Sequence, residues 1–125
     1  MKNEFIKELI IKLGKIISYR SKILSSIELE QYDILGEVSV NFIKECKSVC
    51  NLYIKFRINE PRNYYDKKQS KQILFKIMSY IVNLIGKTTK ITNENDITIE
   101  KRQLFMNGLM ELEILKDNYI YILRN

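Results

Sequence analysis

The sequence contains no histidine and no tryptophan, and its 125 residues include only one proline, two cysteines and four glycines. Without histidine the chain lacks the usual general base at neutral pH and the commonest metal ligand. Two cysteines are too few for a disulfide framework. Proline and glycine interrupt the chain so rarely that long helices are favoured over many short strands.

Motifs that carry catalytic chemistry are also missing. The sequence has no glycine-rich phosphate loop of the G-x-x-x-x-G-K-[ST] type and no G-x-S-x-G nucleophile motif. Glu111 and Glu113 are two residues apart, so they point to different faces of a helix. Glu4 and Glu8 do share a face, but near the start of a helix, where acidic residues suit the helix dipole. We expect no catalytic residue, no cofactor and no metal site, and a function other than catalysis.

The length and composition predict one folded domain that comprises residues 1–125. Hydrophobic residues make up 46% of the chain and charged residues 29%, which is typical of a globular protein. No stretch has the uncharged apolar length of a transmembrane segment. Charged residues also interrupt the apolar residues at the start of the chain, unlike the core of a signal peptide. The expected location is the cytoplasm.

Apolar residues recur at steps of three and four residues in four stretches, as in amphipathic helices. The helices are expected at about residues 3–26, 28–58, 66–86 and 96–123. Four long amphipathic helices with short connections predict an all-α fold, an up-down helical bundle. The side chains expected in its core are Phe5, Ile6, Leu9, Ile10, Leu13, Ile16, Ile17, Leu24, Leu35, Val38, Phe42, Cys46, Val49, Tyr53, Phe56, Ile73, Leu74, Ile77, Met78, Ile81, Leu84, Ile85, Phe105, Leu109, Leu112, Leu115, Tyr119 and Ile122.

Local signals give the expected boundaries of the first two helices. The Ser25-Ser26 pair is expected to separate them, and Pro61 to end the second, because proline cannot continue the hydrogen-bond ladder. Gly14 suggests a close helix crossing, and Gly36 suggests a kink.

Local signals also bound the last two helices. Asp66 with Gln69 has the spacing of a weak capping box at the start of the third helix. Gly86 is expected to end this helix as a C-cap residue. Asn95 or Asp96 is available to cap the fourth.

Cys46 and Cys50 lie one helical turn apart on the apolar face of the second helix. A zinc site needs about four ligands, which two chains could supply together from two such half-sites. Two thiols one turn apart are poorly placed for a disulfide. The interpretation that we prefer is two small, buried side chains in the core.

The whole net charge of +6 lies in residues 61–92, which contain seven basic residues and only Asp66 as an acidic one. The rest of the chain is neutral, with 14 basic and 14 acidic residues. Six basic and aromatic side chains at the start of this stretch form the candidate interaction patch: Arg62, Tyr64, Tyr65, Lys67, Lys68 and Lys71. Lysines contact phosphates and tyrosines stack on bases, so the patch suits non-specific nucleic-acid binding. A solvated basic face at a helix start is the simpler interpretation, and we prefer it.

Two short motifs are found in the second half of the chain. The first is Tyr65-Asp66-Lys67-Lys68-Gln69-Ser70-Lys71-Gln72, an aromatic-Asp pair and a basic run at the start of a long helix. The second is Glu113-Ile114-Leu115-Lys116-Asp117-Asn118-Tyr119-Ile120, near the end of the last expected helix. The two motifs resemble those of the YaaR-like family of small bacterial helical proteins, whose closing motif is Gly-Leu-Leu-x-Asp-Leu-Tyr. The resemblance covers about residues 64–123.

The chain departs from the family pattern at four positions. Gln69 and Ser70 replace a Gly-Arg pair, Glu113 replaces a glycine and Asn118 replaces a leucine. The resemblance implies an all-helical bundle of uncharacterised function without known catalysis.

We therefore expect a non-enzymatic interaction module. Protein–protein binding or self-association, with a homodimer as one form, is the first expectation, because the apolar seams of the second and fourth helices are long. The alternative is non-specific nucleic-acid binding through the basic segment 62–71. Pairing of this segment with Glu100, Glu111 or Glu113 would count against the alternative.

Overall fold

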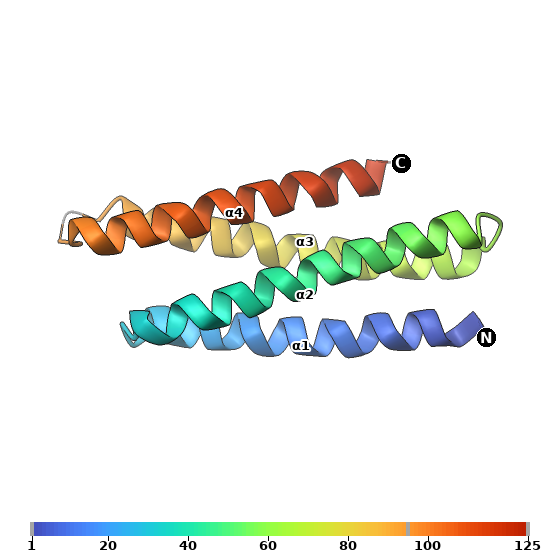
Figure 1. Cartoon of the computed structure of the whole chain (residues 1–125), viewed down its shortest axis with the longest axis horizontal. Coiled ribbons are helices and arrows are strands. Elements are labelled where there is room, and N and C mark those ends of the chain that lie inside the picture. The colour runs from blue at the N-terminus through green and yellow to red at the C-terminus, as the bar shows by residue number, and fades with distance from the viewer. Residues whose placement is uncertain (1, 95, 125) are drawn as a thin grey trace.

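The computed structural model describes residues 2–94 and 96–124, which form four helices and their connections (Figure 1). The helices are α1 (Lys2–Glu28), α2 (Tyr32–Asn59), α3 (Tyr64–Thr92) and α4 (Ile99–Arg124). The described residues contain no strand, so the predicted all-α class is confirmed. Within this part of the chain, no helix combines the length and the apolar character needed to cross a membrane.

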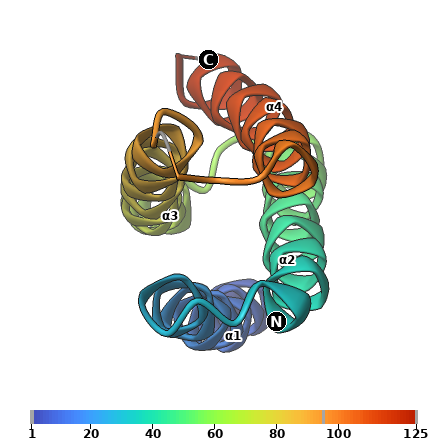
Figure 2. The same cartoon turned by 90° about the vertical axis from the view of Figure 1, so that its left-hand side faces the viewer.

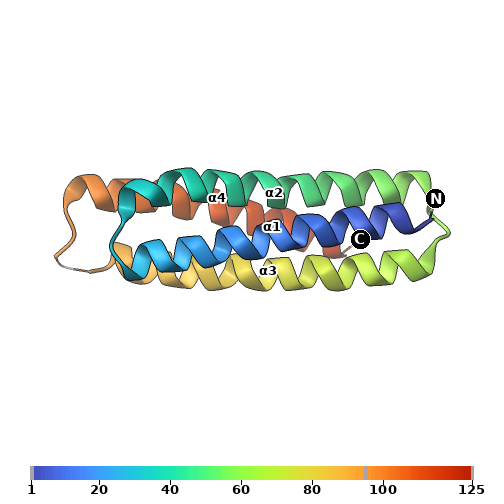
Figure 3. The same ribbon diagram turned by 90° about the horizontal axis from the view of Figure 1, so that it is seen from below.

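The helices run alternately up and down along one long axis (Figure 1, Figure 3). The α1–α2 and α3–α4 connections lie at one end of the bundle, and the α2–α3 connection lies at the other. Viewed from the end, the order around the bundle is α1, α2, α4, α3 (Figure 2). Each helical hairpin is antiparallel, and the two hairpins meet mainly through α1 with α3 and α2 with α4, which run in the same direction. The chain therefore crosses the bundle diagonally between α2 and α3.

The predicted core faces are confirmed for most positions. Every apolar residue expected in the core from α2 is buried, and α3 and α4 bury most of theirs, while Leu109 is half-buried. α1 differs: Ile10 and Ile17 are exposed, and Ile23 is buried although the sequence analysis did not select it. The α1 stripe is narrower than predicted: Ile10 and Ile17 each follow a fully buried residue, Leu9 or Ile16, and so lie about 100° around the helix from it.

The boundary between α1 and α2 was predicted too early. Ser25 and Ser26 lie inside α1, and Ser26 is buried. The helix ends instead at Glu28, and Glu30, two residues beyond it, has a φ of 57° in the left-handed region. The backbone N–H of Gln31 donates a hydrogen bond to the carbonyl of Ser26 at 2.8 Å. The backbone N–H of Glu30 donates to the carbonyl of Ile27 at 3.2 Å. This is the hydrogen-bond pattern of a Schellman motif, with glutamate where glycine is usual.

The predictions made for Gly86 and Gly14 were wrong. Gly86 does not end the third helix, because α3 continues to Thr92, and Gly36 does not divide α2. A Cβ built at Gly14 meets no atom within 4 Å, so this glycine marks no close crossing. A glycine inside a helix costs only about 1 kcal/mol, which the buried side chains on both sides of it outweigh.

The start of α4 also differs from the prediction. α4 begins at Ile99, and the hydroxyl of Thr98 accepts a hydrogen bond from the backbone N–H of Lys101 at 3.3 Å, so Thr98 occupies the cap position rather than Asp96. Asn95, the other predicted cap, lies outside the described residues. Pro61 was predicted correctly as the end of the second helix, because α2 stops at Asn59.

Substitution of Gly86 by alanine tests the continuous α3. Gly86 is exposed, its φ is not positive, and an added Cβ meets nothing within 4 Å. The G86A variant should therefore raise the free energy of unfolding by about 0.5–1 kcal/mol, measured by urea denaturation. G14A, another open helical position, should do the same. A loss of stability in G86A alone would indicate a left-handed cap at this residue.

Candidate functional site

The predicted basic segment lies at one end of the bundle, in the α2–α3 connection and the first two turns of α3 (Figure 1). Tyr64 and Tyr65 are each 72% exposed, and Arg62 and Lys68 are also exposed. Lys67 and Lys71 are half-buried. Four of the six residues of the candidate interaction patch are therefore open to solvent: Arg62, Tyr64, Tyr65 and Lys68.

The N-terminus of α3 is fixed by Asn63 rather than by the predicted Asp66 and Gln69. The side-chain oxygen of Asn63 accepts a hydrogen bond from the backbone N–H of Asp66 at 3.2 Å. The amide of Asn63 donates in return to the carboxylate of Asp66 at 3.0 Å, and Asp66 is buried. Gln69 instead donates to the hydroxyl of Tyr65 at 3.0 Å. This reciprocal cap places the first-turn side chains on the surface in a defined orientation.

The basic side chains of the segment are not neutralised by any residue that the structure describes. Arg62, Lys67, Lys68 and Lys71 form no ion pair with any described residue. Glu113 accepts a hydrogen bond from Lys116 at 2.7 Å instead. Glu100 and Glu111 lie in the N-terminal half of α4, which packs beside the other end of α3 (Figure 1). The positive charge therefore remains available to an anionic ligand.

A second surface was missed by the sequence analysis. α4 carries exposed apolar side chains on the side opposite its core-facing residues, with Ile99 82% and Met110 64% exposed. We define the outer face of α4 as seven exposed residues in one row: Ile99, Gln103, Met106, Met110, Ile114, Asp117 and Tyr121. A helical repeat of 3.6 residues brings them to one side of the helix. α4 is thus apolar on two sides, only one of which the bundle covers.

The sequence does hold a signal for this surface. The outer face of α4 steps by four, three, four, four, three and four residues, which is a helical period. The analysis assigned one apolar stripe to each helix, and Gln103 and Asp117 interrupt the second stripe. Counting the apolar residues on both sides of the helix would have identified the outer face of α4.

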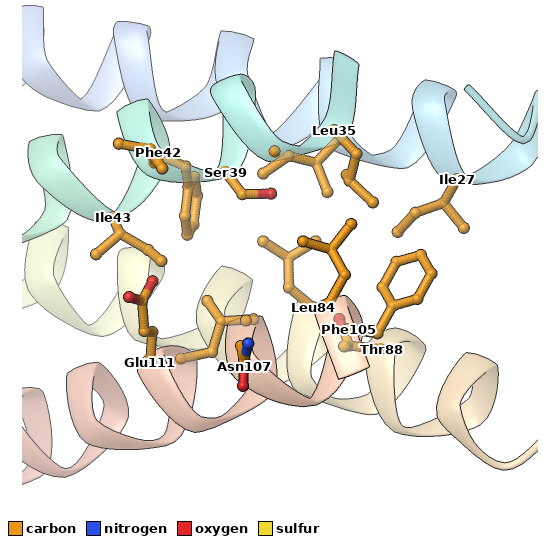
Figure 4. Close-up of a pocket in the computed structure, with 16 residues that line it drawn as sticks. Ile27, Leu35, Ser39, Phe42, Ile43, Leu84, Thr88, Phe105, Asn107 and Glu111 are labelled. Carbon is orange, nitrogen blue, oxygen red and sulfur yellow. The ribbon is translucent and has the colours of Figure 1, made fainter. Parts of the chain in front are cut away.

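A pocket of about 230 Å³ opens between the N-terminal halves of α2 and α4 (Figure 4). Its walls are mostly apolar, and Leu35, Phe42, Leu84 and Phe105 are among the side chains drawn around it. Three small residues line this space, Gly36, Ser39 and Gly108, and a Cβ built at either glycine meets no atom within 4 Å. A group the size of benzene fits a cavity of this order.

Cys46 and Cys50 are buried free thiols, which agrees with the preferred interpretation of the sequence. The hydroxyl of Tyr119 donates a hydrogen bond of 2.7 Å to the backbone carbonyl of Cys46, which ties α4 to α2 in the core. Burial raises the pKa of Cys50 from 9.0 to about 11. Burial, followed by the neighbouring Cys50 and Glu45, raises the pKa of Cys46 as well. Both thiols are therefore protonated and poorly nucleophilic at neutral pH.

Two further observations concern the binding of metal ions and of phosphate. No three Cys, Asp or Glu side chains among the described residues lie close enough together to hold a metal ion. The triplet Gly86-Lys87-Thr88 has the letters that end a phosphate-binding loop, but it lies inside α3. Backbone N–H groups in a helix interior are bonded within the helix, so this triplet presents none to a phosphate.

No family model, no curated protein and no solved structure matches the chain. The resemblance to the YaaR-like family therefore stays a prediction from the two short motifs.

The buried thiols predict a pH dependence of stability. Folding raises the pKa of Cys50 above its unfolded value, so the stabilisation is fully present below pH 9 and is lost as the pH rises toward about 11. Cys46 and Tyr119 act in the same direction because burial raises their pKa values too. Urea denaturation should therefore show a falling free energy of unfolding above pH 9.

The control for this prediction is the double variant C46A/C50A. It should be less stable at neutral pH because it leaves a cavity in the core. Its stability should nevertheless fall less steeply above pH 9. Equal slopes for the two proteins would show that the thiols do not contribute.

Proposed function

We propose that this protein is a non-enzymatic helical interaction module that associates with itself through the outer face of α4. The observation that carries the proposal is the second apolar stripe of α4, which no described part of the chain covers. Single exposed apolar residues are ordinary on protein surfaces, but five exposed apolar residues aligned on one side of a helix are typical of an interaction site. Another helix can pack its own row of apolar side chains against this row.

The size of this surface sets the expected affinity. Ile99 and Tyr121 are about 33 Å apart along the helix, and a helix is about 10 Å wide, so pairing covers roughly 330 Å² on each partner. This is smaller than the roughly 800 Å² per partner of a standard stable interface. The proposed association is therefore weak and depends on concentration.

The cellular compartment that we propose is the cytoplasm. Cys46 and Cys50 are free thiols one helical turn apart, and free thiols are typical of reducing compartments.

Charge at the centre of the outer face of α4 should weaken the association. M110E places a carboxylate in the middle of the apolar row, where the partner would have to desolvate it. The dissociation constant should rise by at least about tenfold, which corresponds to 1.4 kcal/mol. Sedimentation velocity over a wide range of protein concentration would measure the change.

The matched control is V82E, which makes the same change of charge at another exposed apolar residue, on α3. It should leave the dissociation constant nearly unchanged. A wild-type chain that stays monomeric at every concentration would overturn the proposed function.

A second candidate function is non-specific binding of nucleic acid through the basic segment 62–71. Two observations favour it: the two exposed tyrosines, and the basic side chains that form no ion pair with any described residue. Arg62 and Lys68 are the exposed cations nearest to both tyrosines in sequence. Phosphate contacts of this kind release counterions, so the binding would weaken steeply with salt.

Fluorescence anisotropy with a generic DNA duplex tests this candidate. The wild-type affinity should fall with salt, and R62E/K68E should weaken binding and reduce the slope of log affinity against log salt by about 0.9 per lost phosphate contact. K15E/K44E makes the same change of net charge at exposed positions on α1 and α2. Equal losses in both variants would assign the effect to net charge alone, and the basic segment would have no special role.

A further inference from the structure

We infer that two copies of the chain pair α4 against α4 in antiparallel orientation, around a two-fold axis at Met110. The inference rests on the proposed function and deepens it, because it names the orientation and the register of the association. It starts from the spacing of the residues in the outer face of α4, which is a feature separate from their apolar character.

The spacing of the outer face of α4 is the same in both directions along the helix. From Ile99 to Tyr121 the steps are four, three, four, four, three and four residues, and Met110 stands at the centre. In an antiparallel pair centred on Met110, each position of one helix meets a position of the same row on the other. A two-fold interface requires this self-complementarity.

The side chains that meet in this register also match in chemistry. Ile99 faces Tyr121, and Met106 faces Ile114, so apolar groups meet on both sides of the central Met110 pair. Methionine adapts its shape easily, which suits a residue that must pack against its own copy. The two polar positions, Gln103 and Asp117, face each other.

The polar pair distinguishes antiparallel from parallel pairing. Asp117 is exposed and forms no hydrogen bond with any described residue, and the neighbouring Lys116 attracts its carboxylate only electrostatically. Gln103 donates one amide N–H to Asn107 at 3.1 Å, and its second N–H can donate to Asp117 of the second copy. In a parallel pair each residue meets its own copy, and the two Asp117 carboxylates would repel each other. The charges therefore favour the antiparallel pair.

The bundle leaves room for this pairing. α4 stands at a corner of the bundle and does not pack against α1 (Figure 2). All seven residues of its outer face are exposed. A second α4 can approach from outside without moving any helix of the bundle.

Disulfide trapping tests the register. The single variants M110C, M106C and I114C are each oxidised gently at a concentration where the wild-type protein associates, and crosslinked dimer is quantified. M106C and I114C are also mixed, one of them isotope-labelled, so that mass spectrometry identifies mixed dimers. The native Cys46 and Cys50 are buried and protonated, and wild-type protein oxidised in parallel provides the background.

The inference expects M110C to crosslink with itself several-fold above background. M106C and I114C should crosslink poorly alone but efficiently in the mixture. The reason is distance: in this register two copies of residue 106 lie eight residues apart along the axis, about 12 Å, beyond the roughly 7 Å between Cα atoms that a disulfide spans.

Other outcomes separate this inference from the proposed function. Equal self-crosslinking of all three variants would show a parallel pair, and association without crosslinking at any of them would show another register or surface. Either result overturns the inference. Only a failure of the wild-type protein to associate, seen by sedimentation, would overturn the proposed function as well.

Discussion

The packing of α2 and α3 across the diagonal of the bundle is the constraint on which the rest of the structure depends. These two helices contact each other and both of the remaining helices, whereas α1 and α4 do not pack together. α2 supplies a row of buried residues from Leu35 to Phe56, and the Tyr119 hydroxyl attaches α4 to this row through the carbonyl of Cys46. Because α4 is held from one side only, its other side is left to solvent, and that side carries the apolar row.

The sequence predicted the fold class and most of the core because helical periodicity records which face of each helix is buried. Apart from the end of α2 before Pro61, it did not predict the helix ends well, because these depend on few and weak local signals. Gly86 and the Ser25-Ser26 pair have the composition of helix ends, but burial of neighbouring side chains outweighs a helix propensity cost of about 1 kcal/mol or less. The real end of α1 has glutamate at its left-handed position, Glu30, and no sequence rule selects that residue.

Of the two candidate sites, the sequence analysis predicted the basic segment but not the outer face of α4. The basic segment was predictable because charge is visible in the sequence, and its exposure could be expected at a helix start. The extent to which Lys67 and Lys71 are buried depends on the neighbouring helices and could not be predicted. The outer face of α4 follows a helical period, yet a period alone cannot say which of two apolar stripes the bundle covers. That choice depends on the order of the helices, which single-sequence patterns leave open.

The diagonal connection has a consequence for how copies of this chain can exchange parts. Each half of the chain is an antiparallel hairpin, and the two hairpins are joined only by the short segment between Asn59 and Tyr64. If α2 ran on into α3 as one helix, the hairpins would separate and each would pack with the hairpin of another copy, as in a domain-swapped dimer. Pro61, the only proline in the chain, lies in this segment and cannot continue the hydrogen-bond ladder of α2. One residue thus opposes an exchange that the rest of the architecture would permit.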